Sequence, residues 1–391
     1  MTIRLTSRAA VSTCALCVAG LLALSPAAAA TRSGADPGPR GGGQRAGVPQ
    51  PSLLYRSGTQ VRPRAGAPRV PDVSALSWLV ADARTGEVLA AHDAHRRLPP
   101  ASTLKTLFAL AVLPVLPGGV RHTVDERELR EVGSGSSLVG VAEGNTYRVT
   151  DLWNGVFLNS GNDAVHVLAA LSGGRRAAAQ RMEAKARSLG ARDTRVLSPD
   201  GYDAPGQVSS AYDLTLFGRE GLRNPDFARY CATVEADFPG RGGDWSYPIR
   251  NTNRLLTGSD GVQRYRGLIG IKNGYTSEAG HTLVAAARRD GRTLVVTVMN
   301  PQDGDGFAVY EEARSLLDWG FASAGRVDPV GSLEALRARP VAHEVPASAA
   351  VTPPGAGSGW AQAGTIAGAA ALGAGVVTLA LRLLGCRLVQ E

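Results

Sequence analysis

Short apolar runs bounded by turn residues lie at both ends of the central part of the chain. Five of them have the length and composition of β-strands: residues 76–81, 87–91, 268–271, 282–287 and 293–299. A turn at residues 83–86 separates the first two, and Asp290-Gly291 provides a tight hairpin turn between the last two. The pattern predicts strands contributed by both ends of one folded region.

The stretch between these two groups of strands has the apolar spacing of helices. Residues 102–113 are apolar on nearly every side, which predicts a buried helix. Residues 151–170 and 176–189 are two further candidate helices, and residues 307–319 form an amphipathic one after the last strand. Strands at both ends and helices between them predict an α+β fold, in which one sheet is assembled from both ends of the region around a helical insert.

The first 72 residues do not show the pattern of a folded domain. Residues 1–30 have a short basic start, an apolar stretch and a small-residue end, which is typical of a secretory signal cleaved near Ala29 or Ala30. The alternative is an uncleaved N-terminal anchor, although the apolar run is short for spanning a bilayer. Residues 31–72 are rich in Gly, Pro and Arg, and this composition predicts a flexible linker. The folded domain is then expected at residues 73–326.

A second apolar segment follows the predicted domain. Residues 327–359 return to Pro, Ala and Gly and predict another linker. Residues 360–382 are long enough to cross a bilayer, with Trp360 at one interface and Arg382 and Arg387 on the cytoplasmic side. The alternative is a disordered apolar tail, because the segment is rich in Ala and Gly. The two ends together predict an exported protein with a single C-terminal membrane anchor and its folded domain outside the cell.

The formal net charge of +8 would suit a nucleic-acid-binding protein if it lay on the folded part. The excess of arginine is instead concentrated in the first 72 residues and in the C-terminal tail, so that residues 73–381 are close to neutral. This distribution argues against nucleic acid as a partner. Only three of the 42 basic residues are lysines, at positions 105, 185 and 272. A buried lysine can lose its proton and act as a base, which arginine does not do.

Ser102 and Lys105 form a Ser-x-x-Lys motif at the start of the predicted buried helix, just after Pro99 and Pro100. Residues three apart lie on one face of a helix. A lysine at the start of an apolar helix is partly desolvated, which lowers its pKa and lets it activate the neighbouring serine as a nucleophile. The structural alternative is a capping serine followed by a lysine whose charged end reaches the solvent.

Two further triplets follow along the chain. Residues 160–162 (Ser-Gly-Asn) can present a hydroxyl that relays a proton and an amide that holds a peptide backbone; the alternative is an N-capping turn before a helix. Residues 272–274 (Lys-Asn-Gly) place a cation beside a glycine on a strand, where a peptide carboxylate can pair with the lysine. The alternative there is an edge strand protected by a lysine. The three motifs in this order, with two of the three lysines inside them, favour one catalytic site.

With these motifs, the chain resembles the serine D-Ala-D-Ala carboxypeptidases, the low-molecular-mass penicillin-binding proteins. The likeness extends over residues 77–321, and it includes residues 251–253, 274–276 and 316–321 beside the three motifs. It implies a β-lactamase/transpeptidase-like α+β fold. Such a fold has a five-stranded antiparallel sheet flanked by helices, a helical lobe, and an active site between the two.

The resemblance also implies a role for each residue of the site. Ser102 would be the acylated nucleophile, Lys105 the general base and Ser160 a proton relay. The residues that would bind the substrate are Asn162, Lys272, Asn273, Gly274 and Tyr275. Lys272 would hold the terminal carboxylate, and the backbone N–H groups of Ser102 and Tyr275 would form the oxyanion hole. The implied substrate is a peptidoglycan stem peptide ending in D-Ala-D-Ala, with β-lactams as covalent inhibitors that acylate the same serine.

The chain departs from the family's usual pattern at several positions. Asn273 stands where a threonine is usual, and residues 200–202 are Asp-Gly-Tyr where His-Gly-Leu is frequent. The first change replaces a hydroxyl that donates to the substrate carboxylate with a longer amide. The stretch between Phe321 and Trp360 is too short and too rich in Pro and Ala for the C-terminal β-domain that many relatives carry.

Two other functions remain open on the sequence. Asn273 favours a degenerate relative that binds wall peptide without turnover. The second is a class A β-lactamase, but such an enzyme needs a glutamate to activate water, and residues 197–210 contain none. His92 and His95 have a spacing compatible with metal binding but no third ligand, so no metal and no cofactor are expected.

Overall fold

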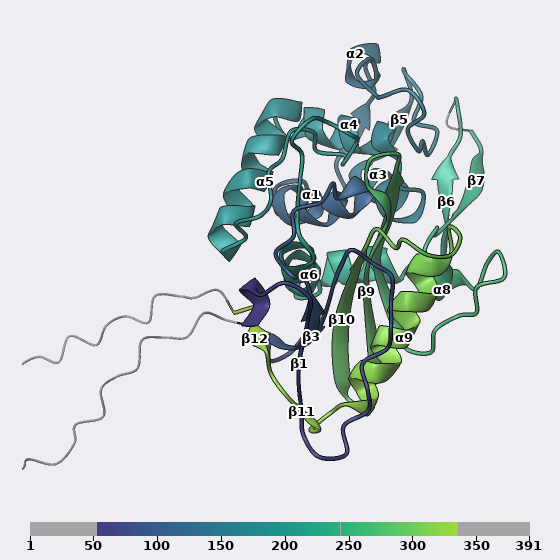
Figure 1. The fold of residues 1–391 in the computed structure, drawn as a ribbon. Coiled ribbons are helices and arrows are strands. Elements are labelled where there is room, and N and C mark those ends of the chain that lie inside the picture. The colour runs from purple at the N-terminus through teal and green to yellow at the C-terminus, as the bar shows by residue number, and fades with distance from the viewer. Residues whose placement is uncertain (1–52, 243, 335–391) are drawn as a thin grey trace, which may run out of the picture. The chain divides into compact units, whose positions relative to one another are not determined.

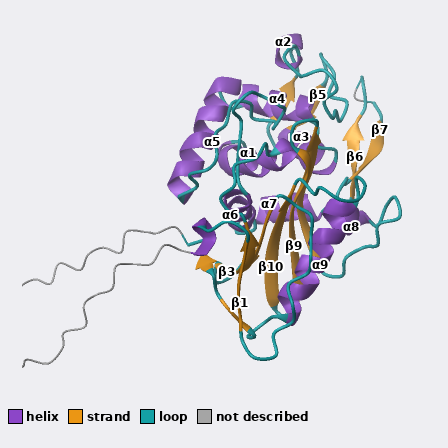
Figure 2. Ribbon diagram, viewed as in Figure 1, coloured by secondary structure: helices purple, strands orange, loops and turns teal. Residues whose placement is uncertain are grey.

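A computed structural model of the protein describes residues 53–242 and 244–334, and an antiparallel β-sheet lies at its centre (Figures 1 and 2). The strands of this sheet are β1 (Thr59–Pro63), β2 (Ser77–Asp82), β3 (Glu87–His92), β8 (Leu268–Thr276), β9 (Gly280–Arg289), β10 (Arg292–Met299), β11 (Val327–Asp328) and β12 (Gly331–Ser332). Their spatial order is β11-β1-β3-β2-β10-β9-β8, and β12 also pairs with β3.

The centre of the sheet joins the two ends of the described region. Strand β2 pairs with β10, so that Leu79 lies opposite Thr297 and Ala81 lies opposite Val295. Strands β8, β9 and β10 follow one another as antiparallel neighbours. The prediction of one sheet built from both ends of the region is therefore confirmed.

The middle of the chain forms most of the helices (Figure 1). They are α1 (Lys105–Val112), α2 (Glu126–Leu129), α3 (Val149–Leu158), α4 (Asn162–Leu171), α5 (Arg175–Leu189), α6 (Ala211–Gly221), α7 (Pro225–Ala232), α8 (Arg254–Thr257) and α9 (Ala308–Ala322), with short 3-10 turns at Leu53–Tyr55 (η1), Ala101–Leu104 (η2) and Leu113–Val115 (η3). Two small antiparallel sheets pair β4 (Arg121–Thr123) with β5 (Thr146–Arg148) and β6 (Glu235–Pro239) with β7 (Ser246–Arg250). Helices α1 to α5 make up a lobe above the sheet, as predicted (Figure 2).

Alternate side chains of the central strands fill two separate cores. On β10, Val295 belongs to the core that includes Phe217 of α6 and the helical lobe. The next residue, Val296, belongs to the core that includes Leu316 of α9. All four side chains are fully buried, and each contributes about 1.5–3 kcal/mol relative to an exposed side chain. Helices α6 and α9 thus cover opposite faces of the sheet.

The first predicted helix is buried, but it begins differently. Ser102 lies in the 3-10 turn η2, and the α-helix begins only at Lys105. Every residue of α1 except Ala111 is buried. Helices α6 and α7 and the β6–β7 hairpin were not predicted.

The predicted helix at residues 151–170 is wrong as one element, because the structure has two helices there. Helix α3 ends at Leu158 and α4 begins at Asn162. Between them Ser160 adopts a left-handed backbone with a φ of +57°, a conformation that costs a non-glycine residue roughly 1–2 kcal/mol and does not continue a helix. The second triplet therefore lies at a corner between two helices.

The predicted linker at residues 31–72 is wrong for its last part. Strand β1 pairs with β3, so that Gln60 lies opposite Ala91. Beyond β1 the backbone carbonyl of Pro68 accepts a hydrogen bond from Trp319 of α9 at 3.1 Å. Before it, Tyr55 stacks flat on His95 with ring centroids 4.2 Å apart. These contacts order the segment even though its Gly, Pro and Arg content is typical of a linker.

Two more boundaries need correction. The domain continues beyond residue 326, since β11 and β12 occupy the start of the predicted 327–359 linker. The sheet is also larger than the five strands predicted, because β1, β11 and β12 extend it beside β3. The predicted signal at 1–30 and anchor at 360–382 lie outside the described residues. None of the helices in residues 53–334 is long and apolar enough to cross a membrane.

A chain that begins at Val73, the predicted domain start, should be less stable than one that begins at Ser52. The shorter chain lacks β1 and the acceptor for Trp319, and it exposes the edge of β3. We expect a loss of about 2 kcal/mol or more, which for a domain of this size lowers the melting temperature by roughly 5 °C. Thermal unfolding of the two chains measures the difference, and equal melting temperatures would contradict the assigned role of β1.

Candidate active site

The 3-10 turn that carries Ser102 is fixed to the sheet through Pro100. The carbonyl of Pro100 accepts hydrogen bonds from the hydroxyl groups of Thr103 and, at 3.1 Å, Thr282 of β9. Ala101, which lies between Pro100 and Ser102, has a left-handed φ of +49°. The turn therefore delivers Ser102 to the point where the helical lobe meets the sheet.

Lys105 is buried and its amino group is fully engaged. The side chain is 1% exposed, and Nζ donates to Ser102 Oγ at 2.6 Å, to Asn162 Oδ1 at 2.7 Å and to the backbone carbonyl of Asp200 at 2.6 Å. An ammonium group has three donors, so these acceptors satisfy all of them. Ser102 and Lys105 are brought together as predicted, and the alternative of a lysine that reaches the solvent is excluded.

Burial lowers the pKa of Lys105 to about 8, while the negative charges of Asp200 and Asp163 oppose this shift. Low-dielectric surroundings disfavour the charged form of a lysine, and nearby carboxylates favour it. At mildly alkaline pH a large fraction of Lys105 is consequently neutral. A neutral amine 2.6 Å from a hydroxyl can accept its proton, which is the requirement for a general base.

The second triplet contributes an amide and a hydroxyl to the same site. Asn162 bridges Lys105 and the 134–137 loop, because its Nδ2 donates to Ser136 Oγ at 2.9 Å. Ser160 is buried, and its Oγ has no hydrogen-bond partner in the described structure. It does not cap α4, whose N-cap residue is Gly161 without a side-chain bond. The N-capping alternative is therefore wrong, and the Ser160 hydroxyl is left unpaired beside the residue that contacts Lys105.

Asp163, next to the triplet, fixes the wall of the site. Its carboxylate accepts backbone N–H groups from Val139 at 3.0 Å, Gly140 at 2.8 Å and Val141 at 2.9 Å. Bonds of this charge-assisted kind are stronger than neutral ones. Residues 139–141, in the loop that precedes β5, are thus fastened to the start of α4.

The third triplet lies on β8, the last strand of the sheet. Lys272 is 1% exposed and donates to the backbone carbonyl of Asn273 at 2.7 Å. Burial lowers its pKa well below the usual range, and the positive charge of Lys105 lowers it further. Asn273 accepts a hydrogen bond on Oδ1 from Thr252 Oγ1 at 3.1 Å. The alternative of a solvent-exposed protective lysine is excluded for Lys272.

Gly274 and Tyr275 complete the β8 side of the site. A Cβ atom at Gly274 would lie only 2.7 Å from the backbone nitrogen of Ser102. Glycine is therefore required here for the strand to approach the serine turn. The side chain of Tyr275 is 62% exposed, and its ring lies 4.5 Å from that of His281. The structure thus connects seven of the eight residues predicted for the site through contacts or a shared pocket, and Ser160 lies two residues before Asn162 without a hydrogen bond to any of them.

A pocket of about 240 Å³ opens beside Ser102. Its lining comes from the serine turn, the 134–137 loop, the start of α4, the 201–203 segment and the end of β8: Ser102, Ser134, Gly135, Ser136, Ser137, Asn162, Gly201, Tyr202, Asp203, Tyr275, Thr276 and Ser277. Many of these side chains are hydroxyls, and the backbone of β8 forms one wall. The pocket suits an extended peptide segment that leads up to the serine.

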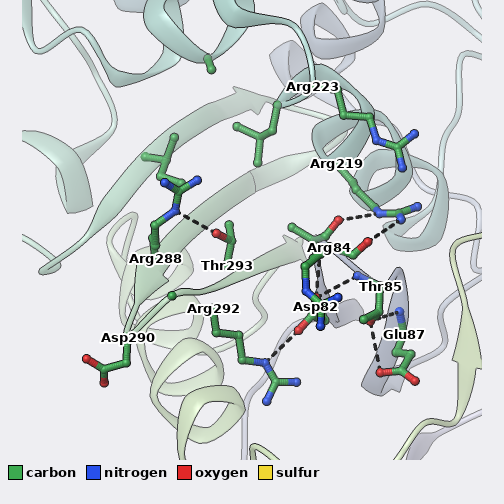
Figure 3. A pocket seen from close by; sticks show the side chains of 15 residues that line it. Asp82, Arg84, Thr85, Glu87, Arg219, Arg223, Arg288, Asp290, Arg292 and Thr293 are labelled. Atoms are coloured by element: carbon green, nitrogen blue, oxygen red, sulfur yellow. Dashed lines mark hydrogen bonds and ion pairs between the residues drawn. The ribbon is translucent and has the colours of Figure 1, made fainter.

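A larger hollow, of about 780 Å³, lies at the other end of β9 and β10, and Figure 3 shows its lining. Several of its polar groups are paired with one another. Arg219 donates to the backbone carbonyls of Ala83 at 2.8 Å and Arg84 at 3.2 Å, and Arg292 pairs with Asp82 at 2.9 Å (Figure 3). These contacts hold the strand ends together, and no serine, cysteine, lysine or histidine is among the residues that line this hollow. The reactive centre is therefore the smaller pocket.

The two histidines with metal-like spacing have other partners. His95 bonds to Asp193 at 2.7 Å and stacks on Tyr55, while His92 bonds to Thr59 at 2.9 Å. Within residues 53–242 and 244–334 no three His, Cys, Asp or Glu side chains gather in a way that could hold a metal ion.

Three groups of the site were not predicted. Two of them are the backbone carbonyl of Asp200 and the hydroxyl of Ser136, which contact Lys105 and Asn162. The third is Thr252, which contacts Asn273. Residues 200–202, which include Asp200, depart from the family's usual pattern, and residues 251–253, which include Thr252, follow it. Neither observation predicts these contacts, because every residue has a backbone carbonyl and the sequence does not show which one Lys105 will contact.

The fold and the buried Ser-Lys pair define a serine acyl-transfer enzyme of the penicillin-binding kind. A family model described as D-alanyl-D-alanine carboxypeptidase matches residues 64–303. Among curated proteins, the chain is 40% identical to D-alanyl-D-alanine carboxypeptidase DacB2 of Mycobacterium tuberculosis over 272 residues, which are 69% of this chain and 89% of that protein. It is 33% identical to DacD of Escherichia coli over 65% of each chain.

Solved structures of related enzymes have the same fold. The crystal structure of a D-alanyl-D-alanine carboxypeptidase from Mycobacterium tuberculosis matches 70% of this chain and all of its own, with a TM-score of 0.63 and 39% identity. The Streptomyces K15 DD-transpeptidase matches 65% of this chain and all of its own, with a TM-score of 0.61 and 27% identity.

The chain therefore belongs to the D-alanyl-D-alanine carboxypeptidase family. The predicted resemblance, the β-lactamase/transpeptidase-like α+β fold and the predicted enzyme class, a serine-type D-Ala-D-Ala carboxypeptidase, are confirmed. Family membership also supports the predicted D-Ala-D-Ala substrate, the binding of β-lactams, and an exported or membrane-associated place at the cell wall.

Gly201→Ala should disrupt the site, whereas Gly206→Ala in the same loop should not. Both glycines have left-handed φ values, +80° and +89°. An added Cβ would lie 2.1 Å from the Ala101 carbonyl oxygen at Gly201, but no closer than 3.6 Å to any neighbour at Gly206. Gly206→Ala should therefore cost only about 1 kcal/mol of backbone strain. Gly201→Ala should displace Asp200 from Lys105 and slow labelling by a fluorescent penicillin at least tenfold, roughly 1.4 kcal/mol in the barrier. Equal labelling rates for the two variants would contradict this account.

Proposed function

We propose that the protein releases the terminal D-alanine from peptidoglycan stem peptides that end in D-Ala-D-Ala, through an acyl-enzyme on Ser102. The observation that carries the proposal is the 2.6 Å contact between Ser102 Oγ and Lys105 Nζ, together with the burial that lowers the pKa of this lysine to about 8. A hydroxyl next to a buried amine whose pKa is lowered in this way can be activated as a nucleophile.

The peptide is proposed to lie along β8 with its C-terminal carboxylate at Lys272. Burial and the charge of Lys105 lower the pKa of Lys272, so a cation is disfavoured there until an anion arrives. A bound carboxylate favours the protonated form. A proton held on Lys272 in turn favours the neutral form of Lys105, so substrate binding itself prepares the base.

In the acylation step Lys105 accepts the proton of Ser102 as Oγ attacks the carbonyl carbon of the penultimate D-alanine. The backbone N–H groups of Ser102 and Tyr275 are proposed to bind the oxygen that becomes negative. This role is supported by the close approach of Gly274 to the nitrogen of Ser102. The peptide C–N bond then breaks, and the leaving amine takes up a proton relayed from Lys105 through Ser160. Free D-alanine and a Ser102 ester are the products.

Water completes the reaction by attacking the ester with Lys105 again as the base. The peptide leaves as a carboxylate and Ser102 regains its proton. Asn162 is proposed to bind the peptide backbone and to hold Lys105 in place, for which its 2.7 Å contact with Nζ is the support. β-Lactams would acylate the same serine, because their strained amide stands in for the scissile bond.

Asn273 is proposed to replace the usual threonine as a donor to the substrate carboxylate. Its Oδ1 is occupied by Thr252 at 3.1 Å, so Nδ2 is the donor. The amide side chain also bonds to the Tyr310 hydroxyl, so a substrate carboxylate shares this donor with Tyr310. The site then binds the carboxylate from a different position than a hydroxyl would. A catalytically silent peptide-binding relative is the alternative that this substitution favours.

A class A β-lactamase is disfavoured by the state of Asp200. Its carboxylate accepts hydrogen bonds from His166 at 3.0 Å, from the hydroxyl of Ser198 and from the backbone N–H of Tyr202 at 3.0 Å. A carboxylate so engaged is not free to activate a hydrolytic water.

The test is labelling of the purified full-length protein by a fluorescent penicillin, alongside D-alanine release from a diacyl-Lys-D-Ala-D-Ala peptide. We expect both, and we expect Ser102→Ala to lose both by at least about a thousandfold. Thermal unfolding provides the control, since the substitution should leave the melting temperature nearly unchanged. Labelling of Ser102→Ala would overturn the assignment of the nucleophile. Labelling of the parent protein without release would favour the peptide-binding alternative.

We further propose that the protein is exported through the signal at residues 1–30 and held by the anchor at 360–382. The long uncharged segment and the two arginines that follow it support this topology. The full-length chain should sediment with membranes and resist extraction by high salt, and a chain that ends at residue 359 should be released. Equal distribution of the two chains between the fractions would exclude the anchor.

A further inference from the structure

Two polar side chains outside the three motifs are completely buried close to Lys105. They are His166 of α4 and Asp200, which lies in the loop between α5 and α6, and each is 1% exposed. His166 Nε2 lies 3.0 Å from Asp200 Oδ2. Burying two such groups is costly unless they are bonded to each other, so the pair calls for an explanation beyond packing.

Asp200 contacts the base in two ways. Its backbone carbonyl accepts a hydrogen bond from Lys105 Nζ at 2.6 Å. Its carboxylate supplies a negative charge that acts on the same amine. The loop is held against the serine turn, since Gly201 packs directly on the carbonyl of Ala101. A displacement of Asp200 would therefore move the acceptor of Lys105 and its counter-charge together.

The hydrogen bonds define the state of the pair. The Nδ1 atom of His166 is buried without a hydrogen-bond partner, so a proton there would be left unsatisfied. Nε2 is therefore the ring nitrogen that donates to Asp200. Although burial raises the pKa of Asp200, the bond from His166 and the charge of Lys105 outweigh it, so that the pKa lies below the usual range. Asp200 is a buried carboxylate with a fixed donor.

We propose that His166 and Asp200 are positioning residues for the general base: His166 holds the Asp200 carboxylate, and Asp200 holds Lys105 and adjusts its proton affinity. The inference rests on the proposed roles of Ser102 and Lys105. It gives a function to the Asp-Gly-Tyr segment at 200–202.

The charges that face Lys105 set the sign of the effect. Asp200 and Asp163 favour its protonated form, whereas burial and the neighbouring Lys272 act against a cation at this site. Removing the negative charge of Asp200 therefore lowers the pKa of Lys105. Because the neutral amine is the active form, the rate of serine acylation rises with pH through this pKa. The acidic limb of that profile should move to lower pH when Asp200 loses its charge.

The first test is the substitution Asp200→Asn, which keeps the shape and the backbone carbonyl but removes the charge. In the parent protein the acidic limb of the fluorescent-penicillin acylation rate should have its midpoint near pH 8. In Asp200→Asn we expect it about one pH unit lower. The matched control is Asp213→Asn, which removes another fully buried carboxylate; it accepts from Asp193 and Thr194 and does not act on Lys105. Its acidic limb should stay in place.

A second readout does not depend on catalysis. The chain has only three lysines, so lysine labelled with ¹³C at Cε gives three resonances that Lys105→Arg and Lys272→Arg assign. In Asp200→Asn the pH midpoint of the Lys105 resonance should move to lower pH. The resonance of Lys185, which lies near Glu220 and away from the site, should not change. This measurement keeps the inference testable even if D-alanine release fails, because failure of the proposed function would leave the lysine titration intact.

His166 is tested by a pair of variants. His166→Leu removes the donor to Asp200 and should slow acylation at its plateau about tenfold. His166→Gln can donate from nearly the position of Nε2 without titrating, and it should restore the rate to within about threefold of the parent. Superimposable Lys105 titrations in the parent and Asp200→Asn would overturn the electrostatic role. Equal rates for His166→Leu and the parent would overturn the positioning role.

Discussion

Two lysine side chains are buried in one site, where the protonation of one disfavours the protonation of the other. Lys105 and Lys272 are each 1% exposed, and the charge of the first lowers the pKa of the second. A buried charge is tolerated only where acceptors and opposite charges are fixed around it. Lys105 has such surroundings, with Asn162 and Asp200 among its partners, whereas the two acceptors of Lys272 are the backbone carbonyl and, at 3.5 Å, the side-chain Oδ1 of one residue, Asn273. The difference leaves one lysine as a prepared base and the other as a cation site that needs an anion to be complete.

The fold meets this requirement by bringing distant segments within hydrogen-bond distance. The acceptors of Lys105 lie 3, 57 and 95 residues from it in sequence, and they come from the serine turn, the lobe and the loop before α6. Two close backbone approaches make the arrangement possible, at Gly201 against Ala101 and at Gly274 against Ser102. Neither leaves room for a side chain. The positions of Ser102 and Lys105 therefore depend on these two close backbone contacts as much as on the reactive groups themselves.

Much of this site could be predicted because each motif combines residue types whose chemistry is local. Ser102 and Lys105 are three residues apart, and their contact follows from one turn of backbone. The carbonyl of Asp200 could not be found in this way, since every residue has one and only the tertiary structure selects it. Strand β1 was missed for a related reason: its residues pair with the edge of β3 through backbone groups, which a Gly-, Pro- and Arg-rich composition does not reveal.

The two ends of the described region meet on one side of the body. Arg62 of β1 lies opposite Asp328 of β11. The ring of Tyr212 packs near His95, on which Tyr55 stacks, and the hydroxyl of Tyr212 donates to the carbonyl of Ser332. The cleft beside Ser102 lies elsewhere, between the lobe and β8. A force that pulls residues 53 and 334 apart would consequently act first on the β1–β11 pair and on the contacts of Tyr212. The body can be held at both ends and pulled without the catalytic groups being drawn apart.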